Sequence, residues 1–165
     1  MNSFKEKALF LNYIVKKDYY KDIKNKMSAF TQHKGTSTFV HSRNVAYCSF
    51  EFANFLERKF NANFNYETLV VGCYLHDFFL YDWHEKGGNH RLHGFTHPKV
   101  ADANAKKFCQ ITKKESDMIL SHMWPLTITK VPKSKEAWVL CLCDKFEASR
   151  EVISHLPKKI KIKFD

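Results

Sequence analysis

Apolar side chains recur every three or four positions along much of the chain, which is the spacing of helices that bury one face. The clearest stretch runs from Val40 to about Lys59. Its apolar face is predicted to carry Val45, Cys48, Phe52 and Phe55. His41 lies on the same face one turn earlier, so we expect a titratable side chain to point toward the core.

A second predicted helix, from Tyr66 to about Asp82, is apolar on every side, which is typical of a central and buried helix. His76 and Asp77 lie in the middle of this stretch, which contains no Lys or Arg. A buried carboxylate costs several kcal/mol unless a cation or several donors compensate it. We therefore expect Asp77 to be paired with a metal ion or with a group from another element.

Further helices are predicted before and after these two. They cover residues 4–17, 20–30, 98–109, 113–123 and the stretch from 135 onward, with breaks at 35–38 and 61–63 and a loop over 83–96. Pro98 is expected to be the first residue of its helix, with His97 as the N-cap. Thr112 with Glu115 is expected to form a capping box, and Ser134 to cap the last helix.

Two more titratable residues lie on apolar faces of these predicted helices. His122 shares its face with Met118 and Ile119. Asp144 lies on a stripe formed by Ala137, Leu140, Cys141 and Ala148. Imidazole and carboxylate groups together are ligands of Fe, Mn, Zn, Ni or Co rather than of Mg or Ca. Several such residues on the inward faces of separate helices predict a metal site in the core of a helical bundle.

The composition favours one all-α domain over residues 1–165. Only 5 Gly and 4 Pro are present, too few for the many tight turns of a β-sandwich or barrel, and no repeat or linker is visible. The five Cys lack a C-x-x-C pair, which favours a reducing compartment. The apolar run over residues 8–15 is too short to span a bilayer, so we expect a cytoplasmic protein with no membrane segment.

The chain is strongly basic, with 27 Lys and Arg against 17 Asp and Glu and a net charge of +10 at pH 7. Such a charge attracts phosphate esters, nucleotides, nucleic acids or acidic lipid surfaces and does not choose among them. Part of it lies in a basic C-terminal tail over residues 157–165, for which a role in solubility is expected. A non-enzymatic, basic nucleic-acid-binding module is therefore one alternative function.

The titratable residues on the apolar faces, together with His97, occur in an order that resembles a known family. They are His41, His76-Asp77, His97, His122 and Asp144. His41, the pair His76-Asp77 and Asp144 resemble the H…HD…D signature of the HD superfamily of metal-dependent phosphohydrolases. His97 and His122 resemble the two histidines that are added in its two-metal branches. The resemblance runs from about residue 38 to residue 151. It implies an all-α, single-domain HD-type helical bundle with a central metal site.

The resemblance also implies roles for these residues, with one or two divalent transition metals as cofactors. One ion is implied to be held by His41, His76, Asp77 and Asp144. Asp77 would bridge to a second ion that His97 and His122 also hold, which makes Asp77 a catalytic residue. The implied reaction is attack of a metal-bound hydroxide on the phosphorus of a phosphate ester, from a nucleotide or a related small molecule. Lys145 resembles the basic residue that many members place against the phosphate.

Several departures from the family pattern leave the substrate open. Leu80 stands where members that hydrolyse guanosine tetraphosphate, and the deoxynucleotide monophosphatases, carry Glu. Met123-Trp124-Pro125 replaces the second His of the cyclic-dinucleotide phosphodiesterases, and their Gly-Tyr-Pro motif is missing. Arg91 and His93, in the predicted loop, are candidate contacts to the substrate phosphate.

Two further expectations concern the metal. A few families with this fold use a di-iron centre with the same ligand types to cleave C–H or C–P bonds with oxygen, so a di-iron oxygenase is a second alternative. Without metal, Asp77 and Asp144 are expected to face each other as like charges and to raise each other's pKa.

Overall fold

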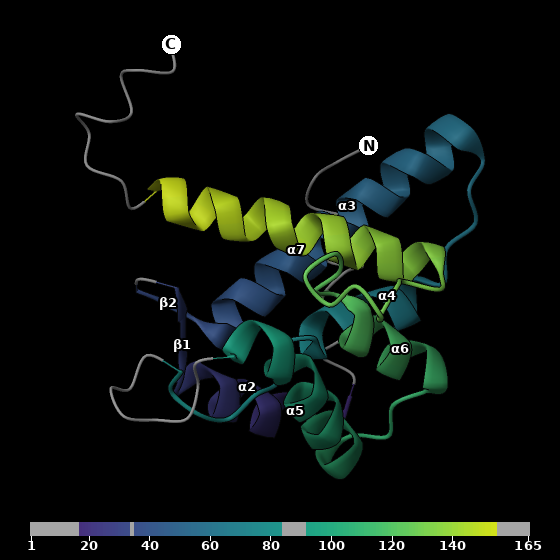
Figure 1. The fold of residues 1–165 in the computed structure, drawn as a ribbon. Coiled ribbons are helices and arrows are strands. Elements are labelled where there is room, and N and C mark those ends of the chain that lie inside the picture. Colours follow the sequence, from purple (N-terminus) through teal and green to yellow (C-terminus); the bar gives the residue numbers. More distant parts are fainter. Residues whose placement is uncertain (1–16, 34, 84–91, 155–165) are drawn as a thin grey trace.

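The computed structural model of the protein is largely helical (Figure 1), which confirms the predicted all-α class. Its helices are α2 (Tyr20–Ser28), α3 (Thr38–Phe60), α4 (Tyr66–Leu75), α5 (His93–Phe108), α6 (Lys113–Ser121) and α7 (Lys135–Ser154). A short antiparallel hairpin, β1 (Thr31–His33) and β2 (Thr36–Ser37), lies between α2 and α3. The strands are too short to form more than a local feature of a helical protein.

The structure describes residues 17–33, 35–83 and 92–154. The basic tail over residues 157–165 and nearly all of the predicted helix over residues 4–17 lie outside these ranges. The organisation of residues 1–165 as a single domain stays a prediction. No helix in the described ranges is long and apolar enough to cross a membrane.

The core is built around α3, α4 and α7. α3 contacts both α4 and α7, and α6 contacts both α4 and α5 (Figure 1). α4 is the central element, because Leu69, Val70 and Leu75 on it are completely buried. Gly72 allows α6 to approach α4 closely, since a Cβ atom at this position would lie 2.6 Å from the Cε atom of Met118. The predicted central helix therefore exists and is buried.

The buried face of α3 differs from the predicted one. Its side chains are mostly small, and they include Ser42, Val45, Ala46, Ser49 and Ala53. Phe55 is 47% exposed, and Phe52 and Cys48 are only partly buried. Phe39 and Phe50 are buried as well, so the buried face of α3 is turned away from the predicted Phe52 and Phe55. His41 is nevertheless completely buried, as predicted.

The predicted helix over residues 66–82 ends early, at Leu75. The backbone then tightens, because the amide of Phe78 donates to the carbonyl of Leu75 at 3.1 Å and the amide of Phe79 donates to that of Asp77 at 2.7 Å. Phe78 and Phe79 stay completely buried although they are outside the helix. The chain thus turns sharply at His76 and Asp77, the two residues that stand out in the sequence pattern.

Helix α5 begins earlier than predicted, at His93 instead of Pro98. His97 is therefore not an N-cap but lies inside the helix, and Pro98 is internal. The first turn is held by contacts that precede the proline. The Thr96 hydroxyl donates to the Leu92 carbonyl at 3.1 Å, and Nδ1 of His97 lies 2.9 Å from the carbonyl of His93. These side-chain contacts explain why the helix extends into the predicted loop.

The predicted caps of α6 and α7 are confirmed. The hydroxyl of Thr112 accepts from the amide of Glu115, whose carboxylate accepts from the amide of Thr112, so the capping box is complete. Ser134 accepts from the amide of Ala137. These caps fix where α6 and α7 begin, and hence the positions of His122 and Asp144 further along.

The hairpin was not predicted from the sequence, which indicated only a break over residues 35–38. Thr31 pairs with Ser37 and His33 with Thr36. Gly35, in the turn, has a φ of 84°, a left-handed conformation that favours glycine. Strand β1 contacts both α3 and α7, so the hairpin lies against two of the helices that form the core.

Candidate metal centre

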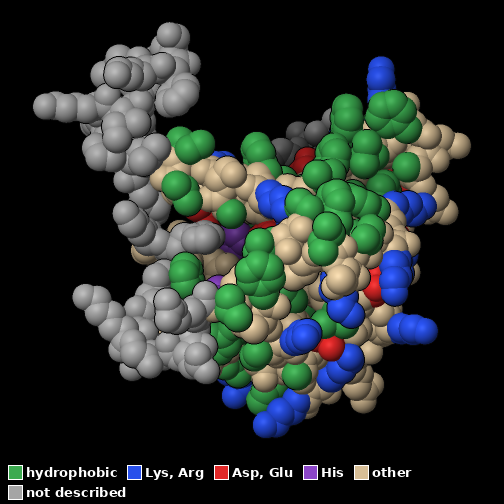
Figure 2. Space-filling view, viewed as in Figure 1, with side chains coloured by type: hydrophobic (Ala, Val, Ile, Leu, Met, Phe, Trp, Pro, Cys, Tyr) green, Lys and Arg blue, Asp and Glu red, His purple; other side chains and the backbone are tan. Residues whose placement is uncertain are grey.

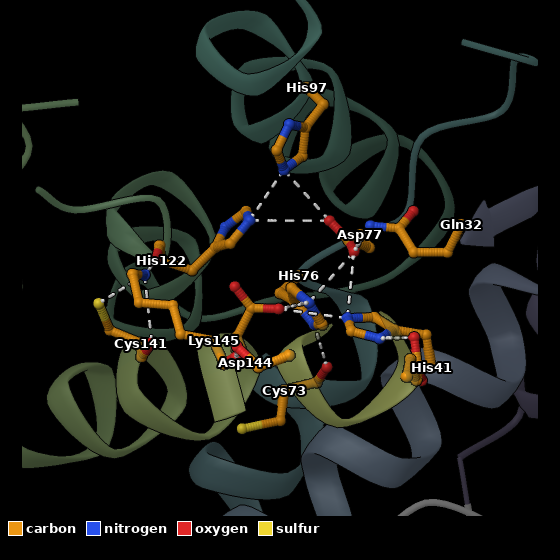
Figure 3. Close-up of polar contacts among 12 residues, drawn as sticks. Gln32, His41, Cys73, His76, Asp77, His97, His122, Cys141, Asp144 and Lys145 are labelled. Carbon is orange, nitrogen blue, oxygen red and sulfur yellow. Dashed lines mark hydrogen bonds and ion pairs between the residues drawn. The ribbon is translucent and has the colours of Figure 1, made fainter. Parts of the chain in front are cut away.

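The six predicted metal ligands meet in the middle of the fold (Figure 3). They come from five helices or helix ends: His41 from α3, His76 and Asp77 from the end of α4, His97 from α5, His122 from the end of α6, and Asp144 from α7. All six side chains belong to buried residues, none of them more than 7% exposed. Five segments that are distant in the sequence thus deliver imidazole and carboxylate groups to one place.

The six residues form two groups that share one member. The first contains His41, His76, Asp77 and Asp144, and the second contains Asp77, His97 and His122. Within each group the potential ligand atoms all lie within 4.8 Å of one another. Asp77 belongs to both groups, which is the arrangement expected of a carboxylate that bridges two ions.

The two oxygen atoms of Asp77 face different groups. Oδ2 lies 3.6 Å from Nε2 of His41 and 3.3 Å from Nε2 of His76. Oδ1 lies 3.2 Å from Nε2 of His97 and 3.7 Å from Nε2 of His122. Asp144 completes the first group, because its Oδ1 atom lies 3.2 Å from His41 Nε2 and 3.4 Å from His76 Nε2.

Each of the four imidazoles is held from behind at Nδ1. Nδ1 of His76 lies 2.6 Å from the carbonyl of Cys73, and Nδ1 of His122 lies 2.7 Å from the carbonyl of Ile119. Nδ1 of His97 lies 2.9 Å from the carbonyl of His93. Nδ1 of His41 lies 3.1 Å from the carboxylate of Glu151. These acceptors favour the tautomer with the proton on Nδ1. The lone pair is then on Nε2, the atom that faces the centre, as is usual for histidines that bind metals.

The atoms at the centre fit a divalent transition metal. His76 Nε2 and Asp77 Oδ1 are buried and make no hydrogen bond within the described residues. Nε2 of His97 and Nε2 of His122 lie only 2.9 Å apart although both Nδ1 atoms face carbonyls. Two lone pairs cannot satisfy each other, whereas a cation satisfies both. Imidazole with carboxylate is the donor set of Fe, Mn, Zn, Ni or Co.

The electrostatics correct one expectation from the sequence. The pKa values of Asp77 and Asp144 are not raised overall. Burial raises the pKa of both carboxyl groups, but neighbouring histidines lower it more strongly. His76 and His97 hold the pKa of Asp77 well below its ordinary range. His41 and His76 do the same for Asp144. Imidazoles lie between the two carboxylates, so attraction to the histidines outweighs repulsion.

The pKa values of His41 and His122 shift in opposite directions in this environment. Burial lowers the pKa of His41, but hydrogen bonds to Asp144 and Glu151 raise it more strongly, to about 9. The pKa of His122 is lowered to about 3 by burial and by the neighbouring His76 and His97. A ring that stays neutral at ordinary pH is available as a metal ligand.

Glu151 belongs to the site although the sequence analysis did not single it out. It lies on α7 seven residues after Asp144, is only 6% exposed, and accepts from Nδ1 of His41. Its spacing from Asp144 places it two turns further along the same face of the helix. The helical spacing of residues in the sequence therefore indicated that Glu151 shares a face with Asp144.

Replacing Glu151 by Gln is expected to weaken the binding of one metal ion about 10–100-fold, because the carboxylate orients the His41 ring and raises its basicity. Titration of metal-free protein with Mn²⁺ by calorimetry measures this loss. Glu147→Gln is a matched control, since Glu147 is also buried on α7 but pairs with Arg150. Equal losses in the two variants would contradict a specific role for Glu151.

A cavity of about 550 Å³ lies against the two ligand groups. It is lined by Gln32, Asp77, Trp83, His93, Gly94, His97, His122, Met123, Pro125, Leu126, Asp144, Lys145 and Ala148. Figure 2 shows histidine side chains at the bottom of a hollow on this face, with hydrophobic side chains beside it. The volume is in the range of sites that hold small molecules.

The remaining predicted site residues lie at the cavity or outside the described residues. Lys145 lines the cavity, and its ammonium group donates to the carbonyls of His122 at 2.9 Å and Cys141 at 3.2 Å. His93 also lines the cavity and stacks on Trp83, with ring centroids 4.8 Å apart. Arg91 lies outside the described residues, so its predicted contact with substrate stays a prediction.

Comparison with known families agrees with this geometry. The HD domain family matches the chain over residues 38–149, which is more than half of its length and nearly all of the stretch predicted to carry the motif. The chain therefore belongs to the HD domain family, a superfamily of metal-dependent phosphohydrolases. No curated protein and no solved structure is significantly similar to it.

Proposed function

We propose that the protein is a hydrolase that cleaves a phosphate ester, from a nucleotide or a related small molecule, with two divalent transition-metal ions. One observation carries the proposal: Asp77 offers one oxygen to each of two buried ligand groups at the base of a cavity. A carboxylate shared in this way suits a centre with two ions, which clamps the attacking and leaving oxygens of a phosphoryl group.

The residues divide between the two ions. One ion would be held by His41, His76, Asp77 and Asp144, and the other by Asp77, His97 and His122. When bound, the ions would activate water as a nucleophile at neutral pH and neutralise the charge that develops on the phosphoryl oxygens. Their binding is favoured by ligand atoms that the surrounding carbonyls and Glu151 already orient.

The walls of the cavity support a phosphate-containing substrate. Lys145 supplies a cation on one side, and its contacts with two carbonyls hold the side chain in place. Apolar side chains, among them Met123 and Leu126, line another part and reduce the access of water. His93, stacked on Trp83, offers a ring that contacts the substrate at the cavity wall. The net charge of +10 attracts an anionic substrate over a longer range.

The first experiment measures the metal content of purified protein and screens phosphate monoesters, diesters and dinucleotide polyphosphates. We expect bound transition metal and hydrolysis of at least one class, both lost on chelation and restored by added metal. Oxygen uptake without hydrolysis would instead indicate a di-iron oxygenase. Salt-sensitive binding of nucleic acid that chelation leaves unchanged, with no hydrolysis, would indicate a nucleic-acid-binding module.

The His97→Ala variant is expected to retain about half of the metal and little activity, because His97 belongs to only one of the two ligand groups. His41→Ala should lose the other ion, and the double variant nearly all metal. Metal analysis of the three proteins, together with initial rates on the best substrate, makes the comparison. Full turnover by His97→Ala would show that a single ion suffices.

A further inference from the structure

The hairpin that the sequence did not predict brings one polar side chain to the candidate metal centre. Side chains alternate along β1, and Gln32 lies on the inner side, only 7% exposed, whereas Thr31 is exposed. Strand β1 contacts α3 and α7, the helices that carry His41 and Asp144. Gln32 therefore enters the site from an element outside the helical bundle (Figure 3).

Gln32 makes a direct contact with the shared carboxylate. Its Nε2 atom donates to Oδ2 of Asp77 at 2.7 Å, a shorter distance than any between Asp77 and the four histidines. Oδ2 is the oxygen that faces His41 and His76. A carboxylate oxygen has two lone pairs, so Oδ2 can accept from Gln32 and still bind an ion.

The other end of the Gln32 amide argues against a role in packing alone. Its Oε1 atom is buried and has no hydrogen-bond partner within the described residues. An unpartnered buried carbonyl destabilises a folded protein, and an apolar side chain of the same length avoids that penalty. A glutamine at this position is therefore explained by its donor group, whose acceptor among the described residues is the carboxylate of Asp77.

We propose that Gln32 is a positioning residue that orients Asp77 for the ion held with His41, His76 and Asp144. The inference rests on the metal centre of the proposed function. The amide holds Oδ2 in place, the oxygen that faces His41 and His76. Because the hydrogen bond is made to Oδ2 alone, the ion of the first group depends on Gln32 more strongly than the ion of the second.

The test removes the donor while keeping the size of the side chain. Two pairs of proteins are compared. The first pair is His122→Ala with and without Gln32→Met, in which the first ligand group is intact apart from the Gln32 change. The second pair is His41→Ala with and without Gln32→Met, in which the second ligand group is intact. Metal-free proteins are titrated with Mn²⁺ by calorimetry. In the first pair the added Gln32→Met change is expected to weaken binding about 10–100-fold, the usual effect of removing a group that orients a ligand. In the second pair it is expected to change binding much less, because Gln32 donates to Oδ2 and not to Oδ1, the oxygen that faces His97 and His122.

The second pair also serves as the folding control, because unchanged binding there shows that Gln32→Met leaves the fold intact. Asn104→Leu is the control for losing a partly buried side-chain amide, since Asn104 donates to the carbonyl of Phe78 at 2.9 Å and not to a candidate ligand. Asn104→Leu should leave both affinities unchanged.

The outcomes separate this inference from the proposed function. A Gln32→Met change that leaves Mn²⁺ binding unaltered in both pairs, or weakens it equally in both, overturns the positioning role and leaves the metal centre standing. A parent protein that binds no Mn²⁺ or other transition metal overturns the proposed function and the inference together. Metal binding without hydrolysis of any ester tested contradicts only the proposed function.

Discussion

The Asp77→Ala variant is expected to contain almost no metal and to hydrolyse no phosphate ester. Asp77 is the one residue common to both ligand groups, so its loss removes a ligand from each ion at once. It also removes the acceptor of the Gln32 amide, and it leaves His97 and His122 facing each other without the carboxylate that contacts both of them. Metal analysis after purification, and activity with added metal, measure the effect.

A matched control for this variant is Asp102→Ala. Asp102 is a buried carboxylate on α5 that accepts from the hydroxyl of Ser116 and pairs with Lys106, away from the candidate centre. We expect Asp102→Ala to lower the melting temperature but to keep its metal. If Asp77→Ala were as metal-loaded as the parent, a centre built around a shared Asp77 would be excluded.

Chelation is expected to lower the melting temperature of the parent protein substantially. Metal that binds only the folded state stabilises it by about 3–4 kcal/mol at several hundred to a thousand times its dissociation constant. For a chain of this size that corresponds to roughly 6–16 °C. The metal-free fold should persist at the lower temperature, because the carboxylates keep attractive contacts with His41 and His76.

Asp144→Asn provides the companion to the chelation experiment. The substitution keeps the shape of the side chain but removes one negative charge from the first ligand group. This variant should melt near the temperature of the chelated parent, respond weakly to added Mn²⁺ or Fe²⁺, and lose most of its hydrolysis. Identical melting curves for the parent before and after verified metal removal would show that the centre contributes nothing to the fold.

The candidate ligands were predictable because of where they lie in the sequence pattern. His41, His122 and Asp144 fall on apolar faces, and Asp77 interrupts a stretch without a single basic residue. Burial of such groups is unfavourable unless something compensates it, so each is conspicuous in the sequence alone. The fold brings these residues together with His97, whose role as a candidate ligand was implied by the resemblance to the HD superfamily and not by burial.

The boundaries of two helices were not predictable from the same pattern. The apolar run around His76 continues through Phe79, yet α4 ends at Leu75. Pro98 is typical of a helix start, yet α5 begins at His93. Periodicity reports which residues are buried, not whether the backbone that buries them is helical. In both places the departure from a regular pattern falls beside a candidate ligand.

Two supporting residues differ in how visible they were. Glu151 repeats the position of Asp144 after two helical turns, and the spacing along that face was sufficient to find it. Gln32 lies in a short segment with no periodicity, and glutamine is common on protein surfaces. Only the hairpin, and its contact with α3 and α7, brings Gln32 to Asp77.

The sequence by itself determined the all-α class and marked His41, His76, Asp77, His122 and Asp144 as titratable groups at buried positions. Helical spacing and the cost of burying charge, which mark them, are local properties of the chain. The tertiary structure decided how these groups divide into two sets, which oxygen of Asp77 faces each set, and that Glu151 contacts His41 while Gln32 contacts Asp77. These relations depend on distances between α3, α4, α5, α6, α7 and the hairpin. Such distances follow from the packing of segments far apart in the sequence, which no local pattern encodes.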